Sequence, residues 1–170
     1  AKPMFLLADS QLLFYQHPDG ILERIRAELT DQSGNGIHKA AYLGASNNDE
    51  PQFFEIFASA MEGLRLNNHR FIRSKPTVQD YDYLEQANLI LLAGGDIARG
   101  WQTFTAQGLH HLITKRYYDG ALLIGISAGA IQLGAKGWQG ECPTVKDCFD
   151  TFGLVPLIID VHNEPEWKRL

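Results

Sequence analysis

The sequence predicts an α/β fold, a mainly parallel, doubly wound sheet with helices on both faces. Two segments, residues 88–95 ("NLILLAGG") and 121–127 ("ALLIGIS"), are continuous and apolar, which is typical of strands buried on both faces of a sheet. Strand-like and helix-like segments also alternate along the whole chain, as they do when helices connect neighbouring parallel strands. The 170-residue length suits a single domain, residues 1–170, with a substantial core.

The first half of the chain alternates short apolar segments with amphipathic ones. Residues 4–8 ("MFLLA") predict a short buried strand, and residues 20–29 ("GILERIRAEL") carry apolar side chains on one helical face. The cluster "TDQSGNG" (30–36) ends this helical pattern and predicts a loop, as such polar and glycine residues do. Residues 38–46 then predict a second strand, and 50–66 a helix.

The second half repeats this alternation around the two apolar strands. Residues 69–74 ("HRFIRS") predict a third strand, and 77–87 ("TVQDYDYLEQA") a further helix. The segment 98–120 is expected to be largely helical, with an interruption at Gly108. A last strand is predicted at residues 154–162 ("LVPLIIDVH"), which closes the series.

Composition and charge narrow the function classes. The net charge of −5 argues against a broad surface for nucleic acid or an anionic membrane. No apolar run approaches the roughly 20 residues of a membrane helix, and the N-terminus lacks a signal-peptide pattern. We therefore expect a cytoplasmic protein with neither nucleic acid nor membrane as a partner. The oligomeric state is left open, with a homodimer as one alternative.

The two cysteines, Cys142 and Cys148, lie in one polar stretch. We interpret them as reduced thiols of a cytosolic protein. A metal site would need further ligands at suitable spacing, and His162 is the nearest one. A single histidine is too weak a basis for such a site, so neither a metal nor an organic cofactor is predicted.

The stretch Gly125-Ile126-Ser127-Ala128-Gly129 places a serine where an apolar strand gives way to a helix. In a nucleophile elbow the serine adopts a strained backbone conformation at such a turn, and the residues two before and two after it must be small. The residue after the serine begins the helix, so its N–H group has no acceptor within the helix and can face a developing oxyanion. The alternative is a tight turn whose serine caps the helix.

A second small-residue turn, Gly94-Gly95, ends the other apolar strand. Glycines allow backbone N–H groups to approach a ligand that side chains would block. The alternative is a strand terminus whose Asp96 caps the next helix, and both interpretations can hold together. Dinucleotide and P-loop phosphate sites are not predicted, because the Gly-x-Gly-x-x-Gly and Gly-Lys-Ser/Thr signatures are missing.

A reactive serine needs a base. Ligands of doubly wound sheets bind at the carboxyl ends of the strands, where Ser127 lies, and His162 follows the last predicted strand at the same edge. The alternative is a structural or exposed histidine. The base in turn needs an orienting acid, for which the candidates between the two residues are Glu141, Asp147 and Asp150.

Three segments together resemble the dipeptidase E / cyanophycinase family of serine peptidases. They are "LILLAGGD" (89–96), "GALLIGISAGAI" (120–131) and "FDTFGLVPLIIDVH" (149–162). They are similar to the family's glycine-rich strand end, its serine elbow and the segment that carries its catalytic histidine. The resemblance implies a class I glutamine amidotransferase-like fold in which serine replaces the cysteine nucleophile.

The resemblance also assigns roles. It implies that Ser127 is the nucleophile and His162 the base, with oxyanion donors at the N–H groups of Gly95 and Ala128. Glu141, in "ECP", occupies the place of the family's acid, with Asp147 as second choice. Family members continue some tens of residues beyond the histidine, so this chain is expected to lack C-terminal strands of the family. The family's preference for an N-terminal aspartate is not carried over.

The function expected from these residues is that of a serine hydrolase. The first hypothesis is a peptidase that cleaves short peptides through a Ser-His-acid mechanism and an acyl-enzyme intermediate. A non-peptidase acyl or amide hydrolase on the same fold is one alternative. A catalytically silent relative that binds a small ligand or a partner is the other.

Overall fold

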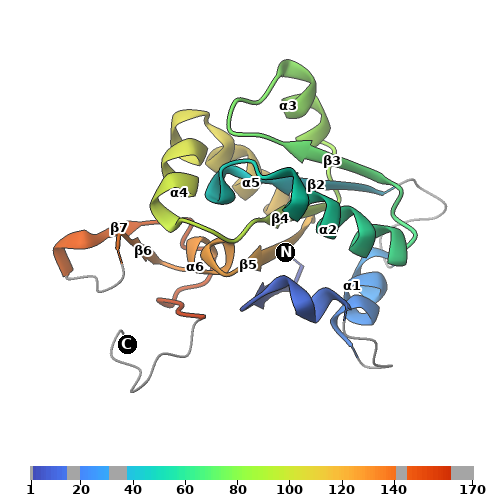
Figure 1. Cartoon of the computed structure of the whole chain (residues 1–170), viewed down its shortest axis with the longest axis horizontal. Coiled ribbons are helices and arrows are strands. Elements are labelled where there is room, and N and C mark those ends of the chain that lie inside the picture. Colours follow the sequence, from blue (N-terminus) through green and yellow to red (C-terminus); the bar gives the residue numbers. More distant parts are fainter. Residues whose placement is uncertain (1, 15–19, 31–37, 141–144, 162–170) are drawn as a thin grey trace.

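The sheet at the centre of the molecule is parallel, as predicted (Figure 1). The computed structural model describes residues 2–14, 20–30, 38–140 and 145–161. Within these residues the five strands of the sheet pair in the order β1-β5-β4-β2-β3, and every pairing is parallel. The strands are β1 (Met4–Leu7), β2 (Lys39–Leu43), β3 (Asn68–Ile72), β4 (Leu89–Leu92) and β5 (Leu122–Ile126).

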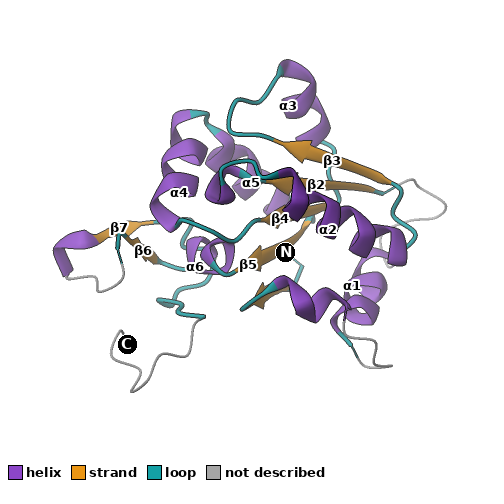
Figure 2. Ribbon diagram, viewed as in Figure 1, coloured by secondary structure: helices purple, strands orange, loops and turns teal. Residues whose placement is uncertain are grey.

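Helices cover both faces of the sheet, which confirms the doubly wound arrangement (Figure 2). One face carries the 3₁₀ helix η1 (Ser10–Phe14), α1 (Ile21–Thr30) and α2 (Pro51–Gly63). The other face carries α3 (Val78–Leu84), α4 (Ile97–Ala106), α5 (Leu109–Tyr118) and α6 (Ala128–Leu133). Each face therefore buries its own hydrophobic cluster between the strands and these helices.

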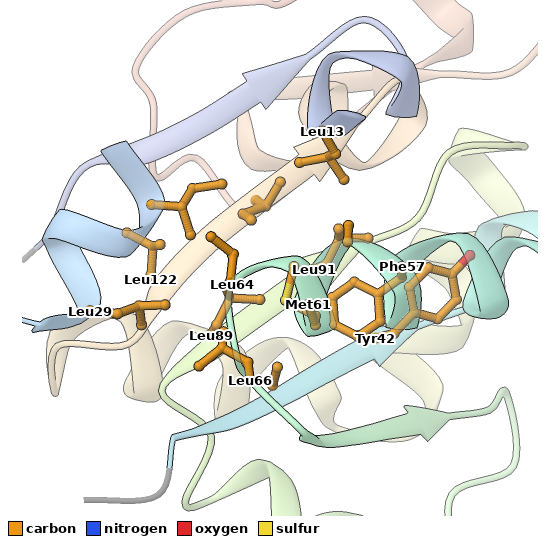
Figure 3. Close-up of a cluster of buried hydrophobic side chains, with 14 of the residues drawn as sticks. Leu13, Leu29, Tyr42, Phe57, Met61, Leu64, Leu66, Leu89, Leu91 and Leu122 are labelled. Atoms are coloured by element: carbon orange, nitrogen blue, oxygen red, sulfur yellow. The ribbon is translucent and has the colours of Figure 1, made fainter. Parts of the chain in front are cut away.

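The alternation of side chains along β4 supplies both clusters. Leu89 and Leu91 join the cluster under α1 and α2, whereas Ile90 and Leu92 join the opposite one. All four side chains are fully buried, which explains why the strand is continuously apolar. Figure 3 shows the first cluster, in which Leu91 and Tyr42 lie toward the carboxyl ends of the strands.

The other predicted elements are confirmed with small shifts at their ends. The predicted helix over 98–120 is divided into α4 and α5 at Gly108, whose φ of 67° suits glycine. The predicted strand at 38–46 ends earlier, at Leu43, because the chain turns into the 3₁₀ helix η2 (Ala45–Asn47). That turn lies at the same sheet edge as the ends of β4 and β5.

The strand predicted at residues 154–162 is wrong over its described part, 154–161, which contains no strand. Instead the Val155 N–H group donates to Leu133 O, and Leu157 O accepts from Ala135 N–H. The chain therefore runs along the end of α6 rather than adding to the sheet. Pro156 has no N–H group for a ladder, and the side chain of Leu157 remains 64% exposed.

A small hairpin-like sheet was missed by the sequence analysis. Strands β6 (Lys136–Trp138) and β7 (Cys148–Asp150) pair antiparallel, and the 3₁₀ helix η3 (Val145–Asp147) precedes β7. Both strands are only three residues long, too short for an alternating pattern of apolar and polar side chains to stand out. The pair extends the molecule beside α4 and α6 (Figure 1).

Candidate active site

Ser127 occupies a sharp turn between β5 and α6. Its φ of 49° and ψ of −110° are unusual for a residue with a side chain, which confirms the strained conformation expected of an elbow. The turn is fixed on both sides, because the Ser127 N–H group donates to Leu7 O at 2.8 Å and its carbonyl accepts from Ile131. The Ser127 side chain does not cap α6, so the alternative of a capping serine is wrong.

The glycines around Ser127 are required by close backbone contacts. A Cβ atom on Gly125 would lie 2.6 Å from the Ala130 nitrogen. A Cβ atom on Gly129 would collide with the Leu92 carbonyl of β4. Both contacts hold α6 tightly against the sheet, so that the helix begins directly after Ser127. The small residues thus serve close packing, and this packing creates the turn that presents the serine.

The turn after β4 brings a second backbone segment to the same place. Gly95 has a φ of 129°, and a Cβ atom there would collide with Ser46 O. The next N–H group, that of Asp96, donates to Ser46 O at 2.8 Å, and the Asp96 carboxylate caps α4 by accepting from the Arg99 N–H group. The predicted cap and the close backbone approach therefore occur together.

Two N–H groups near Ser127 are available for a ligand. Within the described part of the chain, the N–H groups of Gly95 and Ala128 make no hydrogen bond. Ala128 is the first residue of α6, so its N–H group has no acceptor within the helix. Such donors suit the negative oxygen of a tetrahedral intermediate.

Ser127 and Gly95 lie at the boundary of two cavities. The first, with a volume of about 350 Å³, extends over the face that carries η1 and α2. The second, of about 290 Å³, extends toward α6 and the hairpin-like sheet and includes Trp138. Since both residues line both cavities, a bound molecule could extend to either side of the serine.

The predicted base and acid, His162 and Glu141, lie outside the described residues. Two described residues that are close to them in the sequence line the second cavity. Gly140, which directly precedes Glu141, and Asp160, which is two positions before His162, both line the second cavity together with Ser127.

The other candidate acids lie elsewhere. Asp147 is exposed in η3 and lines neither cavity. The Asp150 carboxylate accepts from Lys136 Nζ at 2.6 Å on β6, and its side chain is 85% exposed. Neither Asp147 nor Asp150 is therefore placed beside Ser127.

A buried polar group that the sequence analysis missed connects the two turns. Gln132 of α6 is fully buried, and its Nε2 donates to Ser46 Oγ at 3.1 Å and to Ile97 O at 2.9 Å. Ser46 in turn accepts the Asp96 N–H group. In the sequence, Gln132 resembles an ordinary helix residue, and only its buried setting reveals the contact.

Neither a group of candidate metal ligands nor a helix able to cross a membrane is found among the described residues. Across residues 2–14, 20–30, 38–140 and 145–161, no three His, Cys, Asp or Glu side chains are grouped as metal ligands would be. Cys148 is half-buried, whereas Cys142 lies outside the described residues. None of the helices in this part of the chain has the length and apolar character needed to cross a membrane.

Two solved structures share this fold. A peptidase from an acI-B1 actinobacterium aligns with a TM-score of 0.69 and 17% identity, over 89% of this chain and 64% of that chain. A candidate peptidase E protein from Listeria monocytogenes EGD-e aligns with a TM-score of 0.63 and 19% identity, over 90% of this chain and 75% of that chain. The chain thus spans less than two thirds of the actinobacterial peptidase.

Two comparisons at the level of sequence give different results. None of the curated proteins is significantly similar to the chain. The model of peptidase family S51, however, matches residues 4–168, from β1 to beyond His162. This match includes both glycine-rich turns and Ser127, and it confirms the family resemblance deduced from the sequence. The chain belongs to peptidase family S51.

Proposed function

We propose that this protein is a cytoplasmic serine peptidase that cleaves short peptides through an acyl-enzyme intermediate. The observation that carries the proposal is the strained turn at Ser127, beside the N–H groups of Gly95 and Ala128. A serine in this setting presents its hydroxyl to a bound carbonyl, and the two N–H groups suit the oxygen of that carbonyl. Membership of peptidase family S51 supports the same reaction.

The proposed first step forms the acyl-enzyme. Ser127 Oγ attacks the peptide carbonyl while His162 accepts the hydroxyl proton. The carbonyl oxygen becomes negative and accepts hydrogen bonds from the Gly95 and Ala128 N–H groups. The C–N bond then breaks, and His162 gives its proton to the leaving amine. Glu141 orients the imidazole and stabilises its charged form.

The proposed second step releases the acid product. Water attacks the Ser127 ester, and His162 accepts a proton from that water. The same two N–H groups accommodate the second tetrahedral intermediate. Collapse of this intermediate breaks the ester bond and returns the proton to Ser127 Oγ. The reaction consumes one water molecule for each peptide bond cleaved and needs no further reactant.

Substitution of the serine tests this proposal. Ser127→Ala should abolish hydrolysis of a mixed dipeptide library, measured as release of free amines, while the thermal unfolding midpoint remains close to that of the wild type. Ser59→Ala is the matched control, because Ser59 is an exposed serine of α2 that lines neither cavity. Full activity of the Ser127 variant would contradict the proposal.

Two alternatives predict different results in the same assay. A catalytically silent relative would release no amine even as the wild type. A non-peptidase acyl hydrolase would cleave simple esters through Ser127 but leave every dipeptide intact. Comparison of ester and peptide substrates with one preparation therefore separates the three functions.

A further inference from the structure

We propose that the outer edge of strand β3 is a docking site for an extended, acidic segment of a partner protein. This inference goes beyond the proposed peptidase function and does not rest on it. In the described sheet β3 is the last strand, and β2 and β4 separate it from β5, which leads to Ser127. An edge strand of this kind exposes a row of backbone groups with which an added strand can pair.

The backbone of β3 directs the groups of two residues toward this edge. Successive residues of a strand turn their N–H and C=O groups to opposite sides. The Ile72 carbonyl accepts from the Gly44 N–H group at 3.2 Å, so it faces β2. The groups of His69 and Phe71 therefore face away from β2, where the described part of the chain places no further strand.

A third cavity, of about 710 Å³, lies against this edge. Pro51 and Phe54 contribute to it from α2, whereas Lys75 and Thr77 contribute from the segment that leads into α3. Helices α2 and α3 cover opposite faces of the sheet and both contact β3 (Figure 1). The cavity thus spans the edge from one face to the other, as a site for an added strand must.

The sequence around β3 is cationic. Residues 63–79 contain four Lys or Arg side chains and no Asp or Glu, although the whole chain has a net charge of −5. The four are Arg65, Arg70, Arg73 and Lys75, and the last three line the third cavity. Such a local excess of positive charge favours an acidic ligand.

Arg73 is held in place for such a ligand. The Phe71 ring stacks on Phe54 with 4.9 Å between the ring centroids, and Arg73 Cζ lies 4.5 Å from the Phe71 centroid. A guanidinium held on an aromatic ring loses less freedom when it binds a carboxylate. Arg73 and Lys75 are exposed and form no ion pair with another described residue.

The two carboxylates of the lining do not cancel this charge. Asp80 is already occupied, because it accepts from Arg70 Nε at 2.6 Å and from the Thr77 N–H group at 2.8 Å. Glu55 is exposed on α2 and lines the same cavity. A bound segment would therefore meet two cations of β3 and its following turn for one carboxylate of α2, which favours Asp and Glu over Lys and Arg.

The same charges disfavour a symmetric dimer across this edge. A two-fold axis beside β3 would pair the strand with its own copy and bring the two Arg73 side chains toward each other's cationic edge. Like charges placed together oppose such an interface. The segment that fits best is thus an acidic strand from another protein.

Peptide binding tests the inference. The probe is a short fluorescein-labelled peptide of alternating Glu and Val, and its counterpart carries Lys in place of Glu. Fluorescence anisotropy is measured with Ser127→Ala, so that peptidase activity cannot degrade the probe. The Glu peptide should bind at least about tenfold more tightly than the Lys peptide. Equal affinities, or no binding of the Glu peptide, would overturn the proposal.

The backbone contribution is tested separately. N-methylation of the Glu peptide at one of its two alternating sets of amides should abolish binding, because the added strand then loses its main-chain hydrogen bonds. The bound peptide should also slow hydrogen exchange of the His69 and Phe71 amides, measured by NMR. Binding that leaves both amides unprotected would rule out strand pairing at β3.

Charge reversal locates the site. In the Ser127→Ala background, Arg73→Glu should weaken binding of the Glu peptide by roughly fivefold, as expected for exposed charge pairs that turn from attractive to repulsive. Arg24→Glu is the matched control, because Arg24 is an exposed cation of α1 that lines none of the three cavities. An equal loss in both variants would indicate attraction by overall charge and would overturn the site.

Other occupants give different results. A concentration-dependent dimer in which the His69 and Phe71 amides are protected would assign the edge to a second copy of the chain. Binding of a single-stranded oligonucleotide as tight as that of the Glu peptide would show that the edge recognises negative charge alone. Either result would overturn the assignment to an acidic protein segment.

Discussion

Gln132 Nε2 donates a hydrogen bond to Ser46 Oγ at 3.1 Å, across the edge of the sheet. Gln132 belongs to the helix that begins after Ser127, whereas Ser46 supports the turn that contains Gly95. The contact therefore connects the two turns that supply the proposed oxyanion donors. A residue larger than glycine at position 100 would disturb this contact, because a Cβ atom there would collide with Ser46 Oγ.

Loss of this contact should affect turnover as well as stability. Gln132→Leu leaves Ser46 Oγ without that donor in the interior, so we expect a loss of about 1–3 kcal/mol in the free energy of unfolding. If Gln132 is a positioning residue, kcat should also fall while KM changes little, because the two turns shift relative to each other. Urea unfolding and steady-state kinetics measure the two effects.

The matched control for this variant is Gln102→Leu, since Gln102 lies on the exposed side of α4. It should leave both quantities unchanged. A loss of stability in Gln132→Leu with unaltered kcat would show that the residue has a structural role alone.

The packing of Gly125 predicts a large effect of a single methyl group. Gly125→Ala would place a Cβ atom 2.6 Å from the Ala130 nitrogen, where backbone cannot yield easily. We expect the free energy of unfolding to fall by about 3 kcal/mol, together with loss of activity. Gly63→Ala, at the end of α2, has no atom within 4 Å of its new Cβ and should fold normally. Equal unfolding midpoints in the two variants would contradict this account of the elbow.

The carboxyl group of Asp80, which lies away from the candidate site, should make the stability of the fold depend on pH. Burial acts to raise the pKa of this carboxyl, but hydrogen bonds from Thr77 and Arg70 outweigh burial and hold the pKa below its usual value. A lowered pKa in the folded state means that the stabilisation is complete above the unfolded pKa of about 4 and is lost as the pH falls further.

Asp80→Asn should therefore reduce the free energy of unfolding by about 1–2 kcal/mol at pH 7, because the substitution weakens the capping box of α3. The difference between variant and wild type should shrink as the pH is lowered below about 4. Urea titrations at a series of pH values provide the measurement. A difference that is constant with pH would show that the charge of Asp80 does not stabilise the fold.

The proposed identity of the catalytic acid predicts that substitutions of two carboxylates change kcat to different extents. Glu141→Gln should lower kcat by about three to four orders of magnitude while leaving the fold intact, as expected when the imidazole loses its orienting acid. Asp147→Asn should change kcat little, because Asp147 is exposed and lines neither cavity. Steady-state kinetics of both variants decide between them, and the reverse result would assign the acid to Asp147.

The sequence alone predicted the parts of the molecule that follow local patterns. The apolar run of β4 and the glycines around Ser127 are local, and both the buried strand and the strained turn are present. The segment at 154–161 has the same apolar character as a strand, but its backbone bonds to Leu133 and Ala135 rather than to the sheet. Such competition between partners far apart in the chain is invisible to a local pattern.

The same limit applies to the candidate site. The contact between Gln132 and Ser46 joins residues 86 positions apart, so no local motif reports it. The first cavity is likewise assembled from η1, α2 and the ends of three strands, and its apolar character emerges only once these elements are packed together. The chemistry of the serine turn could thus be predicted, whereas its surroundings depended on tertiary structure.

The central claim is that Ser127 is the nucleophile, and mapping of a covalent label tests it most directly. The chain is treated with a fluorophosphonate, digested and analysed by tandem mass spectrometry, with Ser127→Ala and Ser59→Ala treated in parallel. The account predicts one modification, at Ser127, that is absent from Ser127→Ala and retained in Ser59→Ala. An unmodified Ser127 in the folded protein, or a label on another serine that persists in Ser127→Ala, would contradict it.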